Sequence, residues 1–369
     1  MKKVLFCAST LSHITSFHLP YLQAFAQQGW EVWVAANETG PIPCASHVVA
    51  LPFTKRFFSP QNIRAIFAAR KLLKEQQFTL ISAHTTLAGA VCRAAVWLLR
   101  RRPQVVYTCH GYLFHQKGLK KWAYLLPEKI CAPVTNVLLV MNQEDLQIAR
   151  RFHLYKNHLA LIPGMGFASQ LFSPLPQPQR EAKRAALSIG PKQVVFIYAA
   201  EFSQRKNHSL LLHSFAAAAK QMPTALLFLA GDGSQLTACQ QLVQQLGIGG
   251  QVRFLGHVHN MADWYPLCDI VVSPSQAEGL PFHLMEAMSC GLPAAVSDIK
   301  GHRDLISPGK NGLLFPLGDT AAFAQAMVAL YCNGERRLQY GQAARETAGA
   351  YGLSQVLPQV LKEYPLSIQ

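Results

Sequence analysis

The 369-residue chain has no apolar run that approaches the roughly 18 uninterrupted residues of a membrane span. Its first residues, MKKVLFCAST, combine a basic start with an apolar stretch, but that stretch is short and polar residues follow it directly. A signal peptide needs a longer apolar segment. We therefore interpret this stretch as the first strand of a domain, and we expect no segment that crosses a membrane.

Paired cysteines are also missing. The nine cysteines are odd in number and scattered, with no C-x-x-C pair among them. Disulfide frameworks and structural zinc sites usually show paired spacings. The pattern therefore favours reduced thiols, as in the cytoplasm, without a zinc site.

Acidic residues are scarce in the first half of the chain. Residues 1–170 contain 19 lysines and arginines against 6 acidic residues, whereas residues 171–369 contain 15 against 13. The net charge of +15 is therefore concentrated in the first half. Such a basic half favours an anionic partner: nucleic acid, an anionic lipid surface or a phosphorylated substrate. The alternative is a general charge that only keeps the protein in solution.

The chain does have a regular alternation of short apolar runs and amphipathic segments. In the first half the strand-like runs are KVLFCAS, EVWVAAN, TLISAH, QVVYTCH and NVLLVMN, and in the second half they are QVVFIYAA, TALLFLAGDG, QVRFLG, DIVVSP and PAAVSD. Nearly continuous apolar strands separated by helices are typical of a parallel sheet covered on both faces. We therefore predict an α/β protein with two doubly wound, Rossmann-like domains that face each other across a ligand cleft.

The boundary between the domains is predicted from proline. The segment SPLPQPQR, at residues 173–180, holds three prolines and is interpreted as an interdomain linker. The predicted parts are an N-terminal domain at 1–168, a C-terminal domain at 169–345, and a helical tail at 346–369 that returns to the N-terminal domain.

Three stretches of the second half suggest a site for an anion. In LAGDGSQL, Gly231 follows a buried strand, where backbone N–H groups could approach a phosphate at a helix N-terminus. The third glycine of the dinucleotide fingerprint is absent, so a plain glycine turn is an equal interpretation. In AEFSQRKNHSL, the cations Arg205 and Lys206 could bind a diphosphate and stabilise it as it leaves; the alternative is a solvated helix start.

The third stretch is EGLPFHLMEAM, residues 278–288. Pro281 fits the first turn of a helix, which places Glu278 in the loop before that helix and Glu286 about one and a half turns inside it. Two acceptors beside a phosphate site suit a nucleotide sugar, with one carboxylate for the hexose and one for the ribose. The alternative is a capping carboxylate and a glutamate on a helix surface.

Together these stretches resemble glycosyltransferase family 4, a large group of retaining glycosyltransferases with the two-domain GT-B fold. The likeness in the second half runs in order through Lys206, LAGDGSQL, QVRFLGHVHNMADWY, CDIVVSPSQAEGLPFHLMEAMSCGLPAAVSDIKGHRDLI and PGKNGLLF. In the first half, HITSFHLPYLQAFAQQGWEVWVAAN, YTCHGYLFHQKG and NVLLVMNQEDLQIA are similar to the subgroup that builds capsular, exopolysaccharide or O-antigen repeats. The likeness spans nearly the whole chain.

The resemblance implies a role for each matching residue of the second half. Lys206, with Arg205 beside it, would bind the donor diphosphate, Glu278 would hold hydroxyls of the transferred sugar, and Glu286 would hold the ribose. The remaining donor-binding positions are the backbone near the base, at Gly256, His257 and Val258, the helix start at Gly279, Leu280 and Pro281, and the turn at Gly231.

In the first half, the resemblance implies that His110 faces the donor sugar. The loop from Ser9 to His18 would line the acceptor side. Three positions depart from the family pattern: Glu201 stands where an arginine is common, Ser9-Thr10 where paired glycines are common, and Ala168 where aspartate is common.

The expected function is transfer of a hexosyl unit from a nucleotide sugar, in the first instance a UDP-sugar, to a lipid-linked saccharide, with retention, in surface polysaccharide synthesis. The resemblance implies no metal or other cofactor. A GT-B-like epimerase of UDP-N-acetylhexosamine is the alternative enzyme. A nucleic-acid-binding module is the alternative of another class, although the basic clusters contain no recognisable DNA or RNA motif, so no nucleic-acid partner is expected.

Cations interleaved with aromatic and aliphatic residues predict where the protein meets a membrane. The clusters are KRFF at 55–58, RRR at 100–102 and KGLKKWAYLL at 117–126. Such surfaces adhere to anionic leaflets. We expect a cytoplasmic protein bound peripherally to the inner face of the cell membrane through its N-terminal domain; the alternative is basic helix faces that contact only water.

Other histidines are interpreted as structural or solvent-facing. His13, His115 and His283 fall in this group. His257-x-His259 has the spacing of metal ligands, but no further ligand lies near it in the sequence. It is interpreted as a loop.

Overall fold

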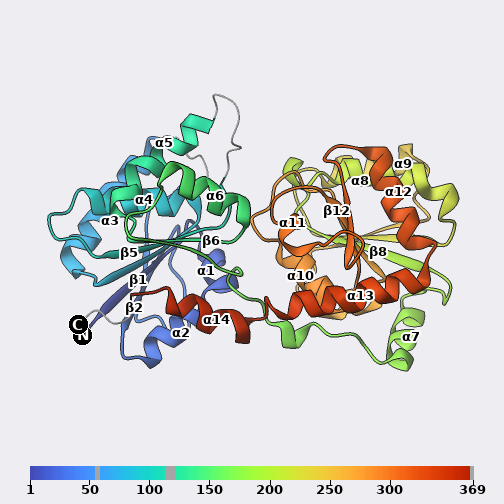
Figure 1. Ribbon diagram of the computed structural model, residues 1–369, viewed down its shortest axis with the longest axis horizontal. Coiled ribbons are helices and arrows are strands. Elements are labelled where there is room, and N and C mark those ends of the chain that lie inside the picture. The colour runs from blue at the N-terminus through green and yellow to red at the C-terminus, as the bar shows by residue number, and fades with distance from the viewer. Residues whose placement is uncertain (55–58, 113–120, 366–369) are drawn as a thin grey trace. The chain divides into compact units, whose positions relative to one another are not determined.

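The computed structural model describes residues 1–54, 59–112 and 121–365 (Figure 1). Two compact units make up the chain. The first contains residues 1–166 together with the segment that follows residue 353, and the second contains residues 167–353. Each unit is built on one parallel sheet. The predicted class, α/β with two doubly wound sheets, is confirmed.

The first unit has a seven-stranded sheet in the order β3-β2-β1-β4-β5-β6-β7. Its strands are β1 (Lys3–Cys7), β2 (Glu31–Ala36), β3 (His47–Ala50), β4 (Leu80–His84), β5 (Gln104–Cys109), β6 (Val137–Val140) and β7 (His158–Leu161). Because every pair is parallel, all strands end at the same edge. The order reverses between β1 and β4, which is where doubly wound sheets bind ligands.

Helices cover both faces of this sheet. They are α1 (Leu11–Phe17), α2 (Leu19–Gln27), α3 (Gln61–Gln76), α4 (Thr86–Trp97), α5 (Lys121–Cys131), α6 (Gln143–Phe152) and α14 (Leu353–Lys362), with the 3₁₀ turn η1 (Ala132–Val134). In Figure 1, α3, α4 and α5 lie on one side of the sheet, and α2 and α14 lie on the other. Phe25 of α2 contacts both Phe6 of β1 and Tyr364, which follows α14. The inner strands are mostly apolar because both of their faces are buried, and Ser82, His84 and Thr108 are the buried polar residues within β4 and β5.

The second unit has a six-stranded parallel sheet in the order β10-β9-β8-β11-β12-β13. Its strands are β8 (Val194–Ala199), β9 (Ala225–Ala230), β10 (Val252–Gly256), β11 (Ile270–Ser273), β12 (Ala294–Ser297) and β13 (Gly312–Phe315). Here the order reverses between β8 and β11, so the loops that follow these two strands are the expected ligand-binding loops.

The helices of the second unit begin inside the proline-rich segment. They are α7 (Gln177–Ala186), α8 (His208–Ala218), α9 (Leu236–Gln245), α10 (Phe282–Ser289), α11 (His302–Leu305), α12 (Thr320–Tyr331) and α13 (Gly334–Gly349). Short 3₁₀ turns are η2 (Ser169–Leu171), η3 (Gln204–Lys206), η4 (Ala219–Gln221), η5 (Met261–Asp263) and η6 (Tyr265–Leu267). The interpretation of residues 173–180 as an interdomain linker is wrong, because a proline is tolerated in the first turn of a helix and α7 starts there.

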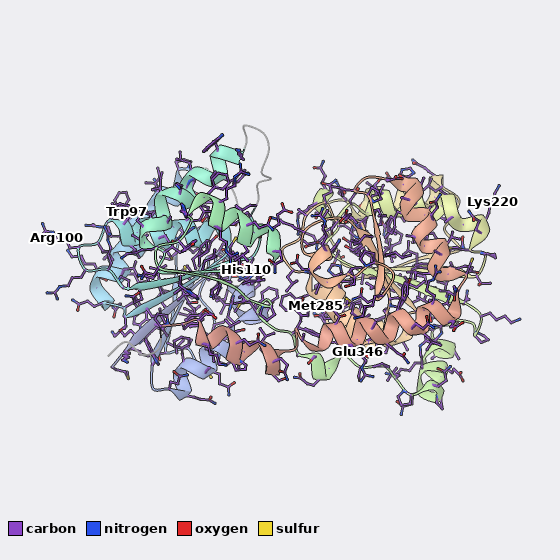
Figure 2. The ribbon with its side chains drawn as sticks, in the orientation of Figure 1. Trp97, Arg100, His110, Lys220, Met285 and Glu346 are labelled. Carbon is purple, nitrogen blue, oxygen red and sulfur yellow. The ribbon has the colours of Figure 1, made fainter. Side chains whose placement is uncertain are left out.

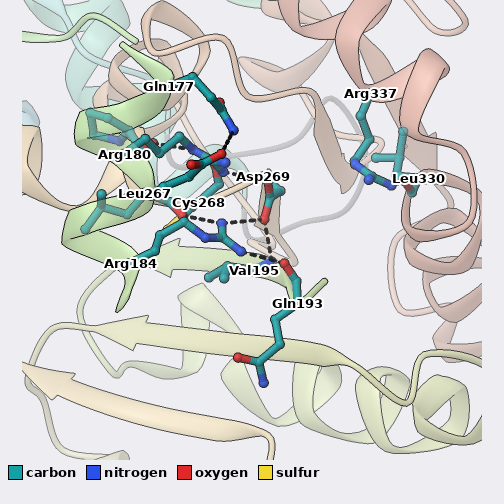
Figure 3. A network of polar contacts seen from close by, with 12 residues as sticks. Gln177, Arg180, Arg184, Gln193, Val195, Leu267, Cys268, Asp269, Leu330 and Arg337 are labelled. Carbon is teal, nitrogen blue, oxygen red and sulfur yellow. Dashed lines mark hydrogen bonds and ion pairs between the residues drawn. The ribbon is translucent and has the colours of Figure 1, made fainter. Parts of the chain in front are cut away.

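An ion-pair network fastens α7 to the strands that carry the candidate site (Figure 3). The Asp269 carboxylate, just before β11, accepts hydrogen bonds from Arg180 at 2.6 Å and Arg184 at 3.1 Å. It also accepts the backbone N–H of Val195 in β8 at 2.8 Å. Arg184 is buried. The network therefore fixes β8 and β11 at the ends opposite their ligand-binding loops.

We expect Asp269→Ala to lower the free energy of unfolding by about 3 kcal/mol, because it leaves two guanidinium groups, one of them buried, without their carboxylate. Urea denaturation of the full chain measures the change. Asp298→Ala is the matched control, because Asp298 pairs with Arg303 at 2.6 Å on the exposed surface of the same unit, where such pairs contribute roughly 0–1 kcal/mol. Equal losses in the two variants would contradict the assignment.

Candidate active site

The loop after β8 presents the two predicted cations. The chain leaves β8 at Ala199, turns through η3, which contains Arg205 and Lys206, and enters α8 after Asn207, which has a positive φ of 56°. The hydroxyl of Tyr198 donates to the Lys206 carbonyl at 3.0 Å. These local contacts hold both cations at the carboxyl edge of the sheet.

The carboxylate of Glu278 lies between these cations. Its Oε1 is 2.6 Å from Lys206 Nζ, and its Oε2 is 3.2 Å from a guanidinium nitrogen of Arg205. The same Arg205 nitrogen donates to the Ala277 carbonyl at 2.8 Å. The structure therefore brings together Glu278, Lys206 and Arg205, which were predicted to bind the donor, from two loops on either side of the switch point.

Charge dominates the protonation of Glu278. The residue is only 9% exposed, and burial by itself would raise its pKa. Lys206, His283 and Arg205 outweigh that effect and hold the pKa of Glu278 near 2. The carboxylate is therefore ionised at any pH at which the protein would work.

The helix after Glu278 begins one residue later than predicted. Pro281 is the N-cap of α10, not part of its first turn, and it caps the helix with no side-chain hydrogen bond. The positive end of the α10 dipole thus adjoins the predicted Gly279–Pro281 segment. Gly301, with a φ of +80°, supports this segment, because a Cβ there would lie 2.6 Å from the carbonyl oxygen of Gly279.

Glu286 sits in a different environment. It is the fifth residue of α10, and the described residues show no hydrogen bond or ion pair from its carboxylate to Lys206, Arg205 or Glu278. Burial raises the pKa of Glu286 to about 7. The two acids of the motif therefore differ in charge state near neutral pH.

The remaining donor positions meet at a depression of about 390 Å³ at the carboxyl ends of β8, β9 and β10. Its lining includes Gly231, His257 and Val258. The Gly231 N–H donates to the Gly256 carbonyl at 2.7 Å. Gly231 has a φ of +136°, and a Cβ there would clash with the Ala200 carbonyl, so the close approach of two loops requires glycine.

Two acids line the same depression. Glu201, one of the departures from the family pattern, and Asp232 are both exposed there. Sequence reasoning gave Asp232 no role. Its position between two glycines directly after β9 was the signal available in the sequence.

In the first unit, His110 and His18 lie in one cluster of imidazoles. His110 Nε2 is 3.3 Å from His13 Nε2, and the ring centroids of His18 and His84 are 3.8 Å apart. His13 was interpreted as structural, and His84 was not singled out. Ser9 lies just before α1, and its backbone N–H donates to the Thr85 hydroxyl at 3.2 Å, next to His84 in the chain.

Burial controls the protonation of these rings. It lowers the pKa of His13 to about 4 and lowers the pKa values of His18, His84 and His110 well below their ordinary value. All four imidazoles are therefore neutral at pH 7.

The first unit also carries an exposed apolar stripe on α5. Trp122, Leu126 and Ile130 recur every four residues and are each more than half exposed. The neighbouring α4 ends at Trp97, 41% exposed, whose indole N–H donates to the Ile130 carbonyl. Figure 2 shows Trp97 and Arg100 projecting from this unit.

Cations lie near Trp97, and the guanidinium of Arg102 is 5.0 Å from the centroid of its ring. A depression of about 600 Å³ near the end of α4 is lined by five of them, Arg70, Lys74, Arg100, Arg101 and Arg102. Residues 55–58, which form the predicted KRFF cluster, residues 117–120 and His115 lie outside the described residues. In the described part of the chain, no helix has both the length and the hydrophobicity that a bilayer span requires.

Two doubly wound parallel sheets, with a cation–carboxylate cluster at the switch point of the second, define an α/β protein with two Rossmann-like units. Similar solved structures include Anabaena Alr3699/HepE in complex with UDP, which matches with a TM-score of 0.79 and 18% identity over 98% of this chain and 99% of that one. This likeness shows the fold, and the GT-B prediction is confirmed.

Sequence comparison then identifies the family. The family described as Glycosyltransferase Family 4 matches residues 21–164, and the family described as Glycosyl transferases group 1 matches residues 179–347. The putative glycosyltransferase EpsD of Bacillus subtilis is 32% identical over 94% of this chain and 92% of its own length. The chain belongs to glycosyltransferase family 4, a family of retaining hexosyltransferases, as its motifs indicated.

A second relative has a more specific name. The UDP-Gal:alpha-D-GlcNAc-diphosphoundecaprenol alpha-1,3-galactosyltransferase of Escherichia coli is 27% identical over 86% of this chain and 84% of its own length. The roles of individual residues in this chain stay predictions.

The raised pKa of Glu286 predicts a pH-dependent stability. Since folding raises this pKa from 4.5 to about 7, the folded state favours the protonated acid. The protonated Glu286 side chain therefore contributes fully to the free energy of unfolding below about pH 4.5, and this contribution is lost as the pH rises through 7. Relative to the wild type, Glu286→Gln should gain up to about 3 kcal/mol in free energy of unfolding between about pH 4.5 and pH 8.5. Urea denaturation at both pH values tests this, and a difference that does not change with pH would refute it.

Proposed function

We propose that this enzyme transfers a hexosyl unit from a UDP-sugar to a lipid-linked saccharide, with retention, in the synthesis of a surface polysaccharide. The observation that carries the proposal is the contact of Glu278 with Lys206 and Arg205 at the switch point of the second sheet. The relative named for a UDP-Gal donor and a diphosphoundecaprenol-linked acceptor supports it. So does the HepE structure, which holds UDP-glucose in one complex.

The donor would exchange partners within this cluster. Without a donor, one carboxylate neutralises part of the charge of two cations. A diphosphate carries more negative charge than a carboxylate and would take over Lys206 and Arg205, aided by the positive end of α10. Glu278 would then be free to accept hydrogen bonds from sugar hydroxyls.

The two acids that line the depression after β8, β9 and β10 would set the orientation of the bound donor. Glu201 and Asp232 would repel phosphates, so the diphosphate would lie toward Arg205 and Lys206, and the base would lie against Gly256, His257 and Val258. Glu286 would accept hydrogen bonds from the ribose. Glu201 stands where the family commonly has an arginine. Arg205, which contacts Glu278 and the Ala277 carbonyl, would supply the positive charge in its place.

Catalysis would consist mainly of leaving-group stabilisation. The two cations and the helix end would stabilise charge on the departing diphosphate, which is a large term in group transfer. Positioning of the donor and exclusion of water would contribute further. Catalysis by these contributions needs no strong nucleophile from the protein. His110, a neutral imidazole in the first unit, would face the donor sugar.

The acceptor would be reached at a membrane surface. The stripe on α5 and the neighbouring Trp97 supply apolar anchors, the cations near Trp97 supply positive charge, and each Lys or Arg near an anionic leaflet contributes about 1 kcal/mol. A lipid-linked saccharide is embedded in such a leaflet. We infer peripheral attachment through the first unit.

Turnover tests the site. We expect Lys206→Ala and Glu278→Gln each to lower kcat/KM by roughly 10²–10³-fold, because each removes a group that acts on developing charge or on the transferred sugar. The assay is UDP release from a panel of UDP-sugars in the presence of a polyprenyl-diphosphate-linked saccharide. Lys220→Ala is the matched control, because Lys220 projects from the surface of the same unit in Figure 2.

Near-normal rates in both site variants would contradict the roles assigned to Lys206 and Glu278. Release of UDP that does not depend on the acceptor would instead support the epimerase alternative.

Liposome flotation tests the membrane surface. We expect the protein to float with vesicles that contain anionic lipid and not with neutral vesicles, and we expect Trp97→Ser/Trp122→Ser to reduce binding at least tenfold, because these indoles would enter the leaflet. Leu317→Ser/Leu338→Ser is the control, since it removes two exposed apolar side chains of the second unit. Binding without preference for anionic lipid, or equal losses in both double variants, would count against this surface.

A further inference from the structure

Four imidazoles meet at the carboxyl edge of the first sheet. His13 lies in α1, His18 between α1 and α2, His84 at the end of β4, and His110 just after β5. They come from segments far apart in the sequence, and the parallel sheet brings these segments to one edge.

Several ring nitrogens of this cluster have no hydrogen-bond partner. His18 is fully buried, and neither of its nitrogens is bonded within the described residues. His84 donates or accepts through Nε2 with the Ser82 hydroxyl at 2.8 Å, but its Nδ1 is likewise buried and unbonded there. An unsatisfied buried polar group typically costs about 1–3 kcal/mol. The cluster therefore holds nitrogens that a bound ligand would stabilise.

The spacing of two of these nitrogens matches that of ligands on one metal ion. A tetrahedral zinc ion bonds imidazole at about 2.0–2.1 Å, which places two ligand nitrogens about 3.3–3.4 Å apart. His13 Nε2 and His110 Nε2 are 3.3 Å apart. The ligand nitrogens of His13, His18 and His110 all lie within 4.8 Å of one another. The His18 ring must move inward for its nitrogen to complete the site.

We propose that His13, His18 and His110 bind a divalent transition-metal ion of the zinc type, with a fourth position open to water or an anion. His84 would position His18, since its ring packs against it and is itself held by Ser82 and, through Ser82, by Tyr364. His13 and His110 are partly exposed, which gives the ion access. The family resemblance implied no metal, and these ligands come from separate segments of the chain.

Metal binding would also affect turnover. A bound ion would hold His110 away from the donor sugar, so Zn²⁺ should inhibit transfer and a chelator should restore it. This consequence rests on the proposed function, whereas the binding itself does not.

The test is titration of the full chain with Co²⁺, followed by displacement with Zn²⁺. Chelator-treated protein with Cys44→Ser and Cys332→Ser, which removes the two exposed thiols, should bind one Co²⁺ with the visible absorption of a four-coordinate ion. His13→Ala and His110→Ala should weaken binding at least tenfold. The matched control is His257→Ala/His259→Ala, because these histidines form the pair with rings 4.7 Å apart in the second unit; it should bind like the parent. Circular dichroism checks that each variant is folded.

Two results would overturn the site: no stoichiometric binding of Co²⁺ or Zn²⁺ at micromolar concentration, or binding that survives His13→Ala and is lost in the His257/His259 variant. Stoichiometric binding without inhibition of turnover would leave the metal site in place and refute the donor-facing role of His110.

Discussion

The Glu278 carboxylate contacts two cations that reach it from a loop some seventy residues earlier in the sequence, and the second unit is organised around that contact. β8 and β11 are neighbours in the sheet, so the loops after them meet. Asp269 and the arginines of α7 hold the opposite ends of these strands. Gly301 permits the backbone of Gly279 to pack closely. Each of these features helps to hold the Glu278 carboxylate close to the two cations.

This arrangement partly neutralises the two cations when no ligand is bound. An unpaired Glu278 would be costly at its degree of burial, and two unpaired cations would repel each other. The ion pairs remove both costs without a ligand. Under the proposed function, a diphosphate that displaces the carboxylate would meet a preorganised pair of cations, and the displaced carboxylate would become available to sugar hydroxyls. The residues that pair with one another in the free enzyme would then each bind a different part of the donor.

Much of the fold could be predicted from apolar runs, and the failures have physical causes. The ten predicted runs all contain strands, but β3, β7 and β13 were missed. All three lie at sheet edges and are only partly buried, whereas the four-residue strands β6, β11 and β12 are fully buried and apolar enough to be recognised. Within the site, the spacing of Glu278 and Glu286 indicated a helix register but not their different pKa values. Burial raises both pKa values, and the neighbouring positive charge outweighs it only at Glu278. The histidine cluster was missed because proximity across four segments leaves no pattern in the sequence.

Calorimetric titration with UDP tests the exchange of partners most directly, because UDP has the diphosphate without the sugar. If Glu278 competes with the diphosphate for Lys206 and Arg205, Glu278→Gln should bind UDP more tightly than the wild type while Lys206→Met binds it more weakly. If Glu278→Gln weakens UDP binding as much as Lys206→Met does, the carboxylate does not give up its cations to the donor, and the account is wrong.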